Sequence, residues 1–251
     1  MGPSLLAFLA GLVAGRFLGV VVAAVPVGTP VREAVSTRPG CGCRAGPWGF
    51  LPVMWWFGDG GRRRLCGCRV GVVLPLVELV TAGAFAGTVY FVGAAWSLPA
   101  YLWFVSVSVV LAFVDVGHRL IPNRVLVPGT AVALLLLAGG AALDDRLGEL
   151  PEALVTGAGY FLALLVPALL TRGAIGMGDA KLAFLLGLFA GYGRWEVALQ
   201  AGAGAFVLAG AVAVLLLVLR VLARDDHIPF GPFMVLAAWI AIARDLATTG
   251  T

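Results

Sequence analysis

Residues 197–219 read VALQAGAGAFVLAGAVAVLLLVL, a run that contains one glutamine and no charged side chain. About 20 consecutive apolar residues are enough for a helix to cross the hydrocarbon core of a bilayer. An open segment can span that core only as a helix, because lipid offers no hydrogen-bond partners to an exposed backbone. The run therefore predicts a transmembrane helix.

Similar apolar blocks recur along the 251-residue chain, which is 61% hydrophobic and only 12% charged. A soluble domain carries about 25% charged residues, so this composition excludes an ordinary water-soluble enzyme, a disordered chain and a disulfide-rich miniprotein. We expect an all-α polytopic membrane helix bundle of about eight spans. They lie near residues 5–26, 72–94, 98–114, 125–143, 153–171, 180–193, 197–219 and 228–243. The sixth block is short and the third is marginal, so seven spans stay an alternative.

The basic residues between these blocks predict the orientation. If the N-terminus lies outside, the cytoplasmic segments carry thirteen Lys and Arg residues and the external segments carry three. This positive-inside bias favours eight spans, since removing one block breaks the alternation. The net charge of +4 is distributed between spans, which argues against a nucleic-acid partner. No basic residue precedes the first block, so we interpret it as an uncleaved span rather than a signal peptide.

One long loop, residues 27–71, separates the first span (1–26) from the remaining membrane-embedded core (72–251). The loop contains two cysteine pairs, Cys41/Cys43 and Cys66/Cys68. In a reducing cytoplasm, metal binding is favoured over disulfides. Four thiolates suit a structural zinc ion, so we predict one here.

Ionisable side chains at membrane depth cost about 2.5–3.5 kcal/mol each on insertion scales, so each of them requires an explanation. Two are aspartates that the predicted topology places at the cytoplasmic face. Asp115 opens the stretch DVGHRLIPN, in which Pro122 ends the helical conformation before the next span. Asp179 lies in GMGDAK, where Gly176 and Gly178 allow an unusual turn and close backbone approach at a helix N-terminus.

Two neighbouring carboxylates can share one proton, so that one activates water while the other donates to a scissile carbonyl. That is the chemistry of an aspartic protease. The alternative from the residues alone is that each aspartate caps a helix or pairs with a nearby cation, Arg119 or Lys181.

Five separated motifs together resemble the type IV prepilin peptidases, the bacterial GxGD aspartic membrane proteases. Asp115 to Asn123 is similar to the family's D-x-x-x-x-x-I-P-N segment, and residues 176–182 are similar to its G-x-G-D-x-K-L segment. The other three motifs are GLVAGRFLGV (11–20), LPLVELVTA (74–82) and IPFGPF (228–233).

The resemblance implies that Asp115 and Asp179 are the catalytic pair, supported by Gly176, Gly178, Lys181 and Pro122. It implies cleavage of prepilin or pseudopilin leader peptides at the cytoplasmic side of the bacterial inner membrane, in type IV pilus or type II secretion systems. Membrane lipid is the other expected partner. Lys181 either lowers the pKa of Asp179 or anchors its span.

Many members of that family also methylate the new N-terminus with S-adenosylmethionine. Here Arg16 and Gly19 stand where the family's opening motif has Ser and Asn, so methylation stays open. Arg16 is expected to pair with Glu78. The cysteine pairs are C-x-C, where the family has C-x-x-C. Two other functions also stay open: a GxGD protease acting on another signal-peptide-like substrate, and a proton or cation transporter without enzymatic activity.

Overall fold

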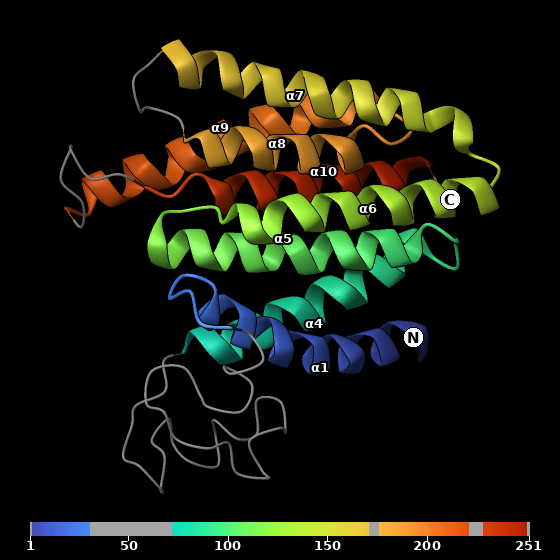
Figure 1. Ribbon diagram of the computed structural model, residues 1–251, viewed down its shortest axis with the longest axis horizontal. Coiled ribbons are helices and arrows are strands. Elements are labelled where there is room, and N and C mark those ends of the chain that lie inside the picture. The colour runs from blue at the N-terminus through green and yellow to red at the C-terminus, as the bar shows by residue number, and fades with distance from the viewer. Residues whose placement is uncertain (1, 31–71, 171–175, 221–227, 250–251) are drawn as a thin grey trace, which may run out of the picture.

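The computed structural model describes residues 2–30, 72–170, 176–220 and 228–249. Each regular element within these ranges is a helix, and each of the eight predicted blocks coincides with one α-helix (Figure 1). These are α1 (Gly2–Ala24), α4 (Val73–Val92), α5 (Leu98–His118), α6 (Asn123–Leu143), α7 (Leu150–Leu170), α8 (Met177–Ala190), α9 (Trp195–Val218) and α10 (Gly231–Thr249), with a short 3-10 turn, η2 (Leu147–Glu149), before α7. The all-α prediction is confirmed.

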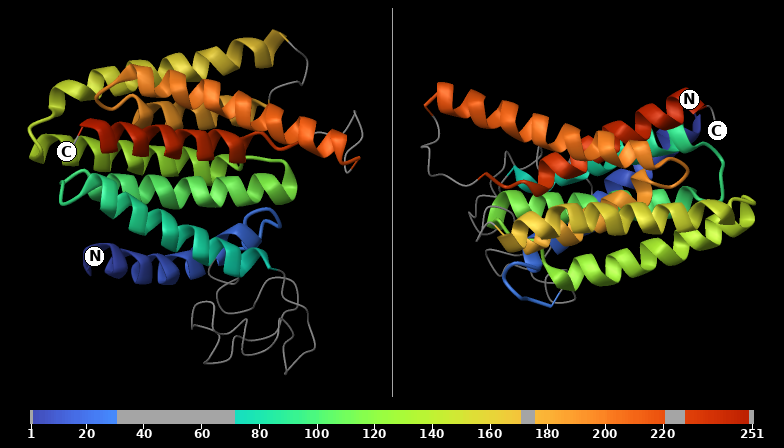
Figure 2. Two further views of the ribbon diagram at one scale, coloured as in Figure 1. Left: turned by 180° about the vertical axis from the view of Figure 1, so that it is seen from behind. Right: turned by 90° about the horizontal axis from the view of Figure 1, so that it is seen from above.

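Seven of these helices are long and apolar enough to cross a membrane, and α8 is the exception. Its 14 residues extend over about 21 Å, less than the roughly 30 Å of a hydrocarbon core. The first and last described residues nevertheless lie at the same end of the bundle (Figures 1 and 2). An even number of passes requires this, so α8 acts as the sixth pass despite its length.

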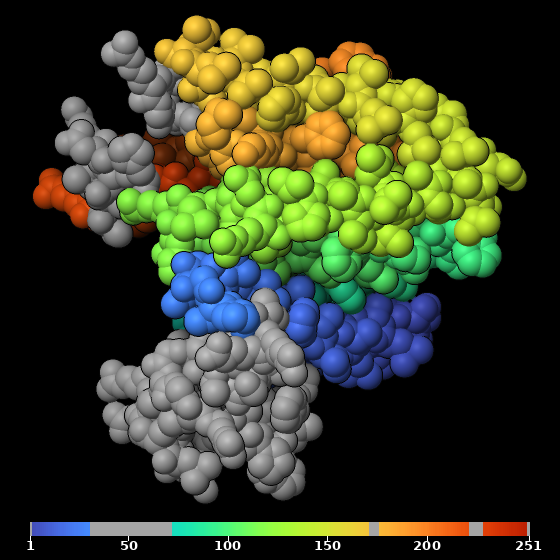
Figure 3. Space-filling model, viewed as in Figure 1, coloured from blue at the N-terminus to red at the C-terminus, as the bar shows by residue number. Residues whose placement is uncertain are grey.

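The helices pack chiefly against their neighbours in sequence. α1 lies along α4, α7 along α8 and α9 along α10, while α5 contacts α4, α6 and α10. In the space-filling view α1 occupies one flank of the molecule and α7 the other, with α5 and α6 between them (Figure 3). α5 and α10 therefore lie between the N-terminal helix pair and the rest of the bundle.

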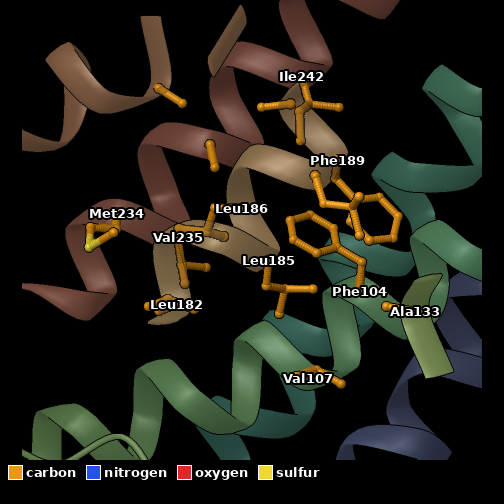
Figure 4. Close-up of a cluster of buried hydrophobic side chains, with 14 of the residues drawn as sticks. Phe104, Val107, Ala133, Leu182, Leu185, Leu186, Phe189, Met234, Val235 and Ile242 are labelled. Atoms are coloured by element: carbon orange, nitrogen blue, oxygen red, sulfur yellow. The ribbon is translucent and has the colours of Figure 1, made fainter. Parts of the chain in front are cut away.

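The short helix α8 is the most buried helix of the bundle. Nearly every residue from Ala180 to Ala190 is buried, which is expected of a helix that is apolar on all sides. The rings of Phe189 in α8 and Phe104 in α5 stack with centroids 4.3 Å apart, and leucines of α8 fill the space between α5 and α10 (Figure 4). Close packing on all sides fixes α8, and with it the aspartate at its N-terminal end.

The connection between α5 and α6 also positions the site. α5 continues to His118, four residues beyond the predicted end, so Asp115 lies in its last turn. Arg119 ends the helix in a left-handed conformation with φ of 52°, and Pro122 is extended and precedes the first residue of α6. Pro122 thus separates the two helices as predicted.

Candidate active site

Asp115 lies in the last turn of α5 and is only 5% exposed. Its Oδ2 accepts a hydrogen bond of 3.1 Å from the backbone N–H of Gly231. Gly231 is the first residue of α10, and the N-terminus of a helix favours a negative charge. The fold thus gives this buried carboxylate a helix N-terminus from a segment 116 residues further along the chain.

Asp179 is the third residue of α8, and its Oδ2 accepts a hydrogen bond of 3.3 Å from the backbone N–H of Gly176. A carboxylate at this position satisfies an N–H group that the helix leaves unpaired. The predicted placement at a helix N-terminus is confirmed. The unusual turn is not found: Gly176 is extended, and neither it nor Gly178 has a positive φ.

The glycines instead permit close packing around Ile121, which lies in the connection between α5 and α6. A Cβ added to Gly178 would lie 2.9 Å from Cβ of Ile121, and one added to Gly231 would lie 3.5 Å from its Cδ1. The same atom on Gly231 would lie 2.8 Å from Oδ2 of Asp115. Ile121 therefore lies between the residue before Asp179 and the residue that binds Asp115.

These contacts bring the two aspartates to one end of the bundle, on either side of Ile121. Among the residues that the structure describes, neither aspartate forms an ion pair. Lys181 donates a hydrogen bond of 3.0 Å to Oδ1 of Asn123 and forms no ion pair with Asp179. Of the alternative reading, pairing with a cation finds no support in the described part of the chain, whereas each carboxylate does accept a hydrogen bond at a helix N-terminus.

A buried and a half-buried carboxyl group close together and without a cation can hold one proton between them. The ionised member can then take a proton from water while the protonated member donates to a carbonyl oxygen.

His118, the histidine nearest to the pair in sequence, is exposed, in keeping with a solvated side chain. The other histidine, His227, lies outside the described residues.

Arg16 and Glu78 form the predicted ion pair, with 3.3 Å between Nη1 and Oε1. The pair lies where α1 and α4 touch, and the Glu78 side chain is fully buried. Gly15 makes the approach possible, because an added Cβ would lie 2.7 Å from Cα of Glu78. Small residues at such crossings let membrane helices pack backbone to backbone.

The predicted zinc site falls on residues that the structure does not describe, since all four cysteines lie in 31–71. Within the described ranges no group of three or more His, Cys, Asp or Glu side chains could hold a metal ion.

A cavity of about 150 Å³ opens between α4, α5 and α10, lined by apolar side chains such as Phe91, Phe104 and Trp239. Such a lining does not suit the charged and polar groups of S-adenosylmethionine.

Three residues of this site lie in the quoted motifs IPFGPF and DVGHRLIPN, but sequence reasoning gave none of them a role of its own: Gly231, Ile121 and Asn123. The first two contribute a backbone group and a packing contact, and neither leaves a chemical signature in a sequence. Asn123 closed the quoted DVGHRLIPN stretch, but its partner Lys181 is 58 positions away.

The sequence profile of the type IV leader peptidase family matches residues 102–243, more than half of the chain and the part that contains both aspartates. The chain belongs to this family. The profile of the bacterial peptidase A24 N-terminal domain matches residues 9–92, which include the Arg16–Glu78 pair. Membership of the leader peptidase family identifies the chain as a peptidase, and with its seven apolar helices as a multi-pass protein of the inner membrane.

Three proteins similar to this chain carry the same name. The prepilin leader peptidase/N-methyltransferase of Pseudomonas aeruginosa is 28% identical over 93% of this chain and 88% of its own length. The protein of that name from Bacillus subtilis is 29% identical over 93% of this chain and 91% of its own length. The one from Myxococcus xanthus is 33% identical over 72% of this chain and 54% of its own length. No solved structure matches.

Proposed function

We propose that this leader peptidase family member cleaves the leader peptides of prepilin-like precursors, pilins or pseudopilins, with Asp115 and Asp179 as its catalytic pair. The observation that carries the proposal is the placement of both carboxylates at one end of the bundle, on either side of Ile121 and without a cation on either among the described residues. The names of the relatives point to the same substrate class.

The proposed reaction needs only these two side chains and water. The ionised carboxylate takes a proton from water as the water oxygen bonds to the scissile carbonyl carbon, and the protonated carboxyl gives its proton to the carbonyl oxygen. The carboxyl group that took a proton from water then gives it to the leaving nitrogen as the C–N bond breaks. The other carboxylate takes a proton from a hydroxyl of the tetrahedral intermediate as the carbonyl re-forms, so both groups return to their starting states. Because Gly231 donates to Asp115 and Gly176 to Asp179, both carboxyl groups keep a fixed orientation during these transfers.

We propose that the pair faces the cytoplasm. The thirteen-to-three distribution of basic residues supports this orientation, and the pair lies at the end of the bundle opposite the two chain termini (Figures 1 and 2). The substrate's apolar helix would then lie in the bilayer, with the leader peptide on the cytoplasmic side. The division into a first span, a cytoplasmic loop and a peptidase core, at residues 1–26, 27–71 and 72–251, belongs to the same proposal.

Cleavage of a defined precursor tests the proposed substrate. The full-length protein, purified in detergent, is mixed with a precursor that carries a glycine before its apolar segment, and the products are read by mass spectrometry. We expect one cut, directly after the glycine. An uncut precursor, together with cleavage of a signal-peptide remnant, would favour the alternative substrate, and failure to cut either would contradict the proposed substrate class.

N-methylation of the new N-terminus is a second candidate activity, because the relatives are named N-methyltransferases as well as peptidases. Transfer of a labelled methyl group from S-adenosylmethionine to the cut product tests this activity.

Metal analysis of the same preparation, before and after dialysis against a chelator, tests the predicted zinc at Cys41, Cys43, Cys66 and Cys68.

A further inference from the structure

The N-terminal turn of α8 is attached to the start of α6 by a hydrogen bond. Nζ of Lys181 donates to Oδ1 of Asn123 over 3.0 Å, joining two helices that otherwise make few contacts with each other. Lys181 follows Asp179 by two positions, and Asn123 follows Ile121 by two positions. The bond therefore connects the α5–α6 connection to the start of α8, and the packing of these two segments determines the distance between the proposed catalytic aspartates.

The packing contact and the hydrogen bond act on the same two segments. Ile121 packs against Gly178, and a methyl group added to Gly178 would lie 2.9 Å from Cβ of Ile121. It also approaches Gly231, the residue that binds Asp115. A displacement of the connection relative to α8 would change both contacts, and hence the separation of Asp115 from Asp179.

We propose that Lys181 and Asn123 form a clasp that sets the distance between Asp115 and Asp179, so that both are positioning residues. This inference rests on the proposed peptidase function. The ammonium group of Lys181 acts through the asparagine oxygen and forms no ion pair with Asp179. Its role is thus geometric, and any other group that accepts a hydrogen bond at position 123 should replace the asparagine.

A double-mutant cycle on cleavage by the full-length protein tests the clasp. We expect Asn123→Ala and Lys181→Met each to lower kcat by about tenfold with KM changed less than twofold, because small misplacements of reacting groups reduce the rate strongly. The double variant should be no slower than the slower single variant. Asn123→Asp, which keeps an acceptor for the ammonium group, should stay within threefold of the wild-type kcat.

Arg124→Met is the matched control. It removes one exposed positive charge beside Asn123, and no hydrogen bond or ion pair of Arg124 is found among the described residues. We expect kcat of this variant to equal that of the wild type. If Lys181→Met lowers kcat while Asn123→Ala does not, or if the two losses multiply in the double variant, the clasp is refuted.

A distance measurement separates failure of the clasp from failure of the peptidase function. Spin labels on genetically encoded keto amino acids at Val116 and Met177, both exposed, leave the four cysteines untouched. We expect the distance distribution between the labels to broaden in Asn123→Ala and to stay narrow in Arg124→Met. If the distance distribution broadens in Asn123→Ala but the wild-type protein cuts no precursor, only the proposed peptidase function is refuted. If the distribution in Asn123→Ala is unchanged, the clasp is refuted.

Discussion

Gly231 donates its backbone N–H to Oδ2 of Asp115 across 116 positions of sequence, and its Cα lies so close to that oxygen that an added Cβ would be 2.8 Å away. The first residue of α10 and the last turn of α5 are therefore in direct contact. The carboxylate obtains a hydrogen-bond donor and the N-terminus of a helix from one residue. This contact makes position 231 sensitive to the smallest side chain.

Gly231→Ala is expected to lower the rate of precursor cleavage by at least about tenfold, because the new methyl group must displace the Asp115 carboxylate. Gly139→Ala is the matched control, since a Cβ at that position of α6 meets nothing within 4 Å. Cleavage rates of the two purified variants check the prediction. Equal rates would mean that the contact at Gly231 has no part in the chemistry.

Gly178→Ala should also lower the rate of precursor cleavage by about tenfold or more, although Gly178 has no side chain that could take part in the chemistry. The added methyl group would come within 2.9 Å of Cβ of Ile121 and must move the start of α8 away from the α5–α6 connection. The distance between labels at Val116 and Met177 should increase in this variant. An unchanged distance with unchanged cleavage would contradict the packing that we describe around Ile121.

Removing one member of the Arg16–Glu78 pair is expected to destabilise the protein by up to about 3–5 kcal/mol, since the charge that stays would lose this ion pair. Arg16→Met and Glu78→Leu should each lower the melting temperature in detergent. The double variant should melt at a higher temperature than either single variant, because neither charge of the pair is then left without the other. Independent, additive losses would show that the two side chains do not depend on one another.

Asp144 caps the other end of the bundle, where its carboxylate accepts hydrogen bonds from the backbone N–H groups of Trp96 and Ser97. The bond from Trp96, with that from Ser97, holds the pKa of Asp144 below its usual value. Asp144→Ala should therefore cost about 1 kcal/mol of stability at neutral pH.

The same contact predicts a pH dependence. Because the pKa is lower in the folded state, the stabilisation is complete above the ordinary pKa of the carboxyl and is lost as the pH falls through its folded pKa. The melting temperatures of wild type and Asp144→Ala should converge in acid. A difference that persists there would point to packing rather than to the charge. Asp145→Asn, a change at the adjacent exposed residue, is the control.

The proposed orientation predicts the compartment of each helix end. Alkaline phosphatase, which needs disulfides and so is active only outside the cytoplasm, should be active when fused after residue 251. It should be inactive when fused after residue 119, near Asp115. The reverse pattern would place the aspartates outside and would contradict the cytoplasmic site.

Hydropathy located the eight blocks, because each helix must satisfy its own backbone in lipid and thus leaves a local apolar signature. The distribution of basic residues was needed to favour eight spans over seven. Pro122 marked the break between α5 and α6 for a similarly local reason, the loss of helical conformation at proline. The Arg16–Glu78 pair could be predicted since both charges lie at membrane depth and each needs a partner.

The rest depends on contacts between distant segments. Gly231 lies in the quoted motif IPFGPF, but its bond to Asp115 appears only when α10 begins beside that aspartate. The functions of Gly176 and Gly178 were predicted in part: close approach was correct, whereas the unusual turn was not, because both glycines have ordinary backbone angles. The pairing of Asp115 with Asp179 came from the resemblance to a family, since neither spacing nor composition predicts it.

The most direct test of the central claim is the rate of precursor cleavage by Asp115→Asn and Asp179→Asn in the full-length protein. Each substitution keeps the size and shape of the side chain but removes a carboxyl group that must be able to gain and lose a proton. We expect both variants to insert in the membrane and to cut no precursor, while Asp145→Asn, the same change at an exposed aspartate, cuts at the wild-type rate. Cleavage by either active-site variant at a rate near that of the wild type would contradict the account.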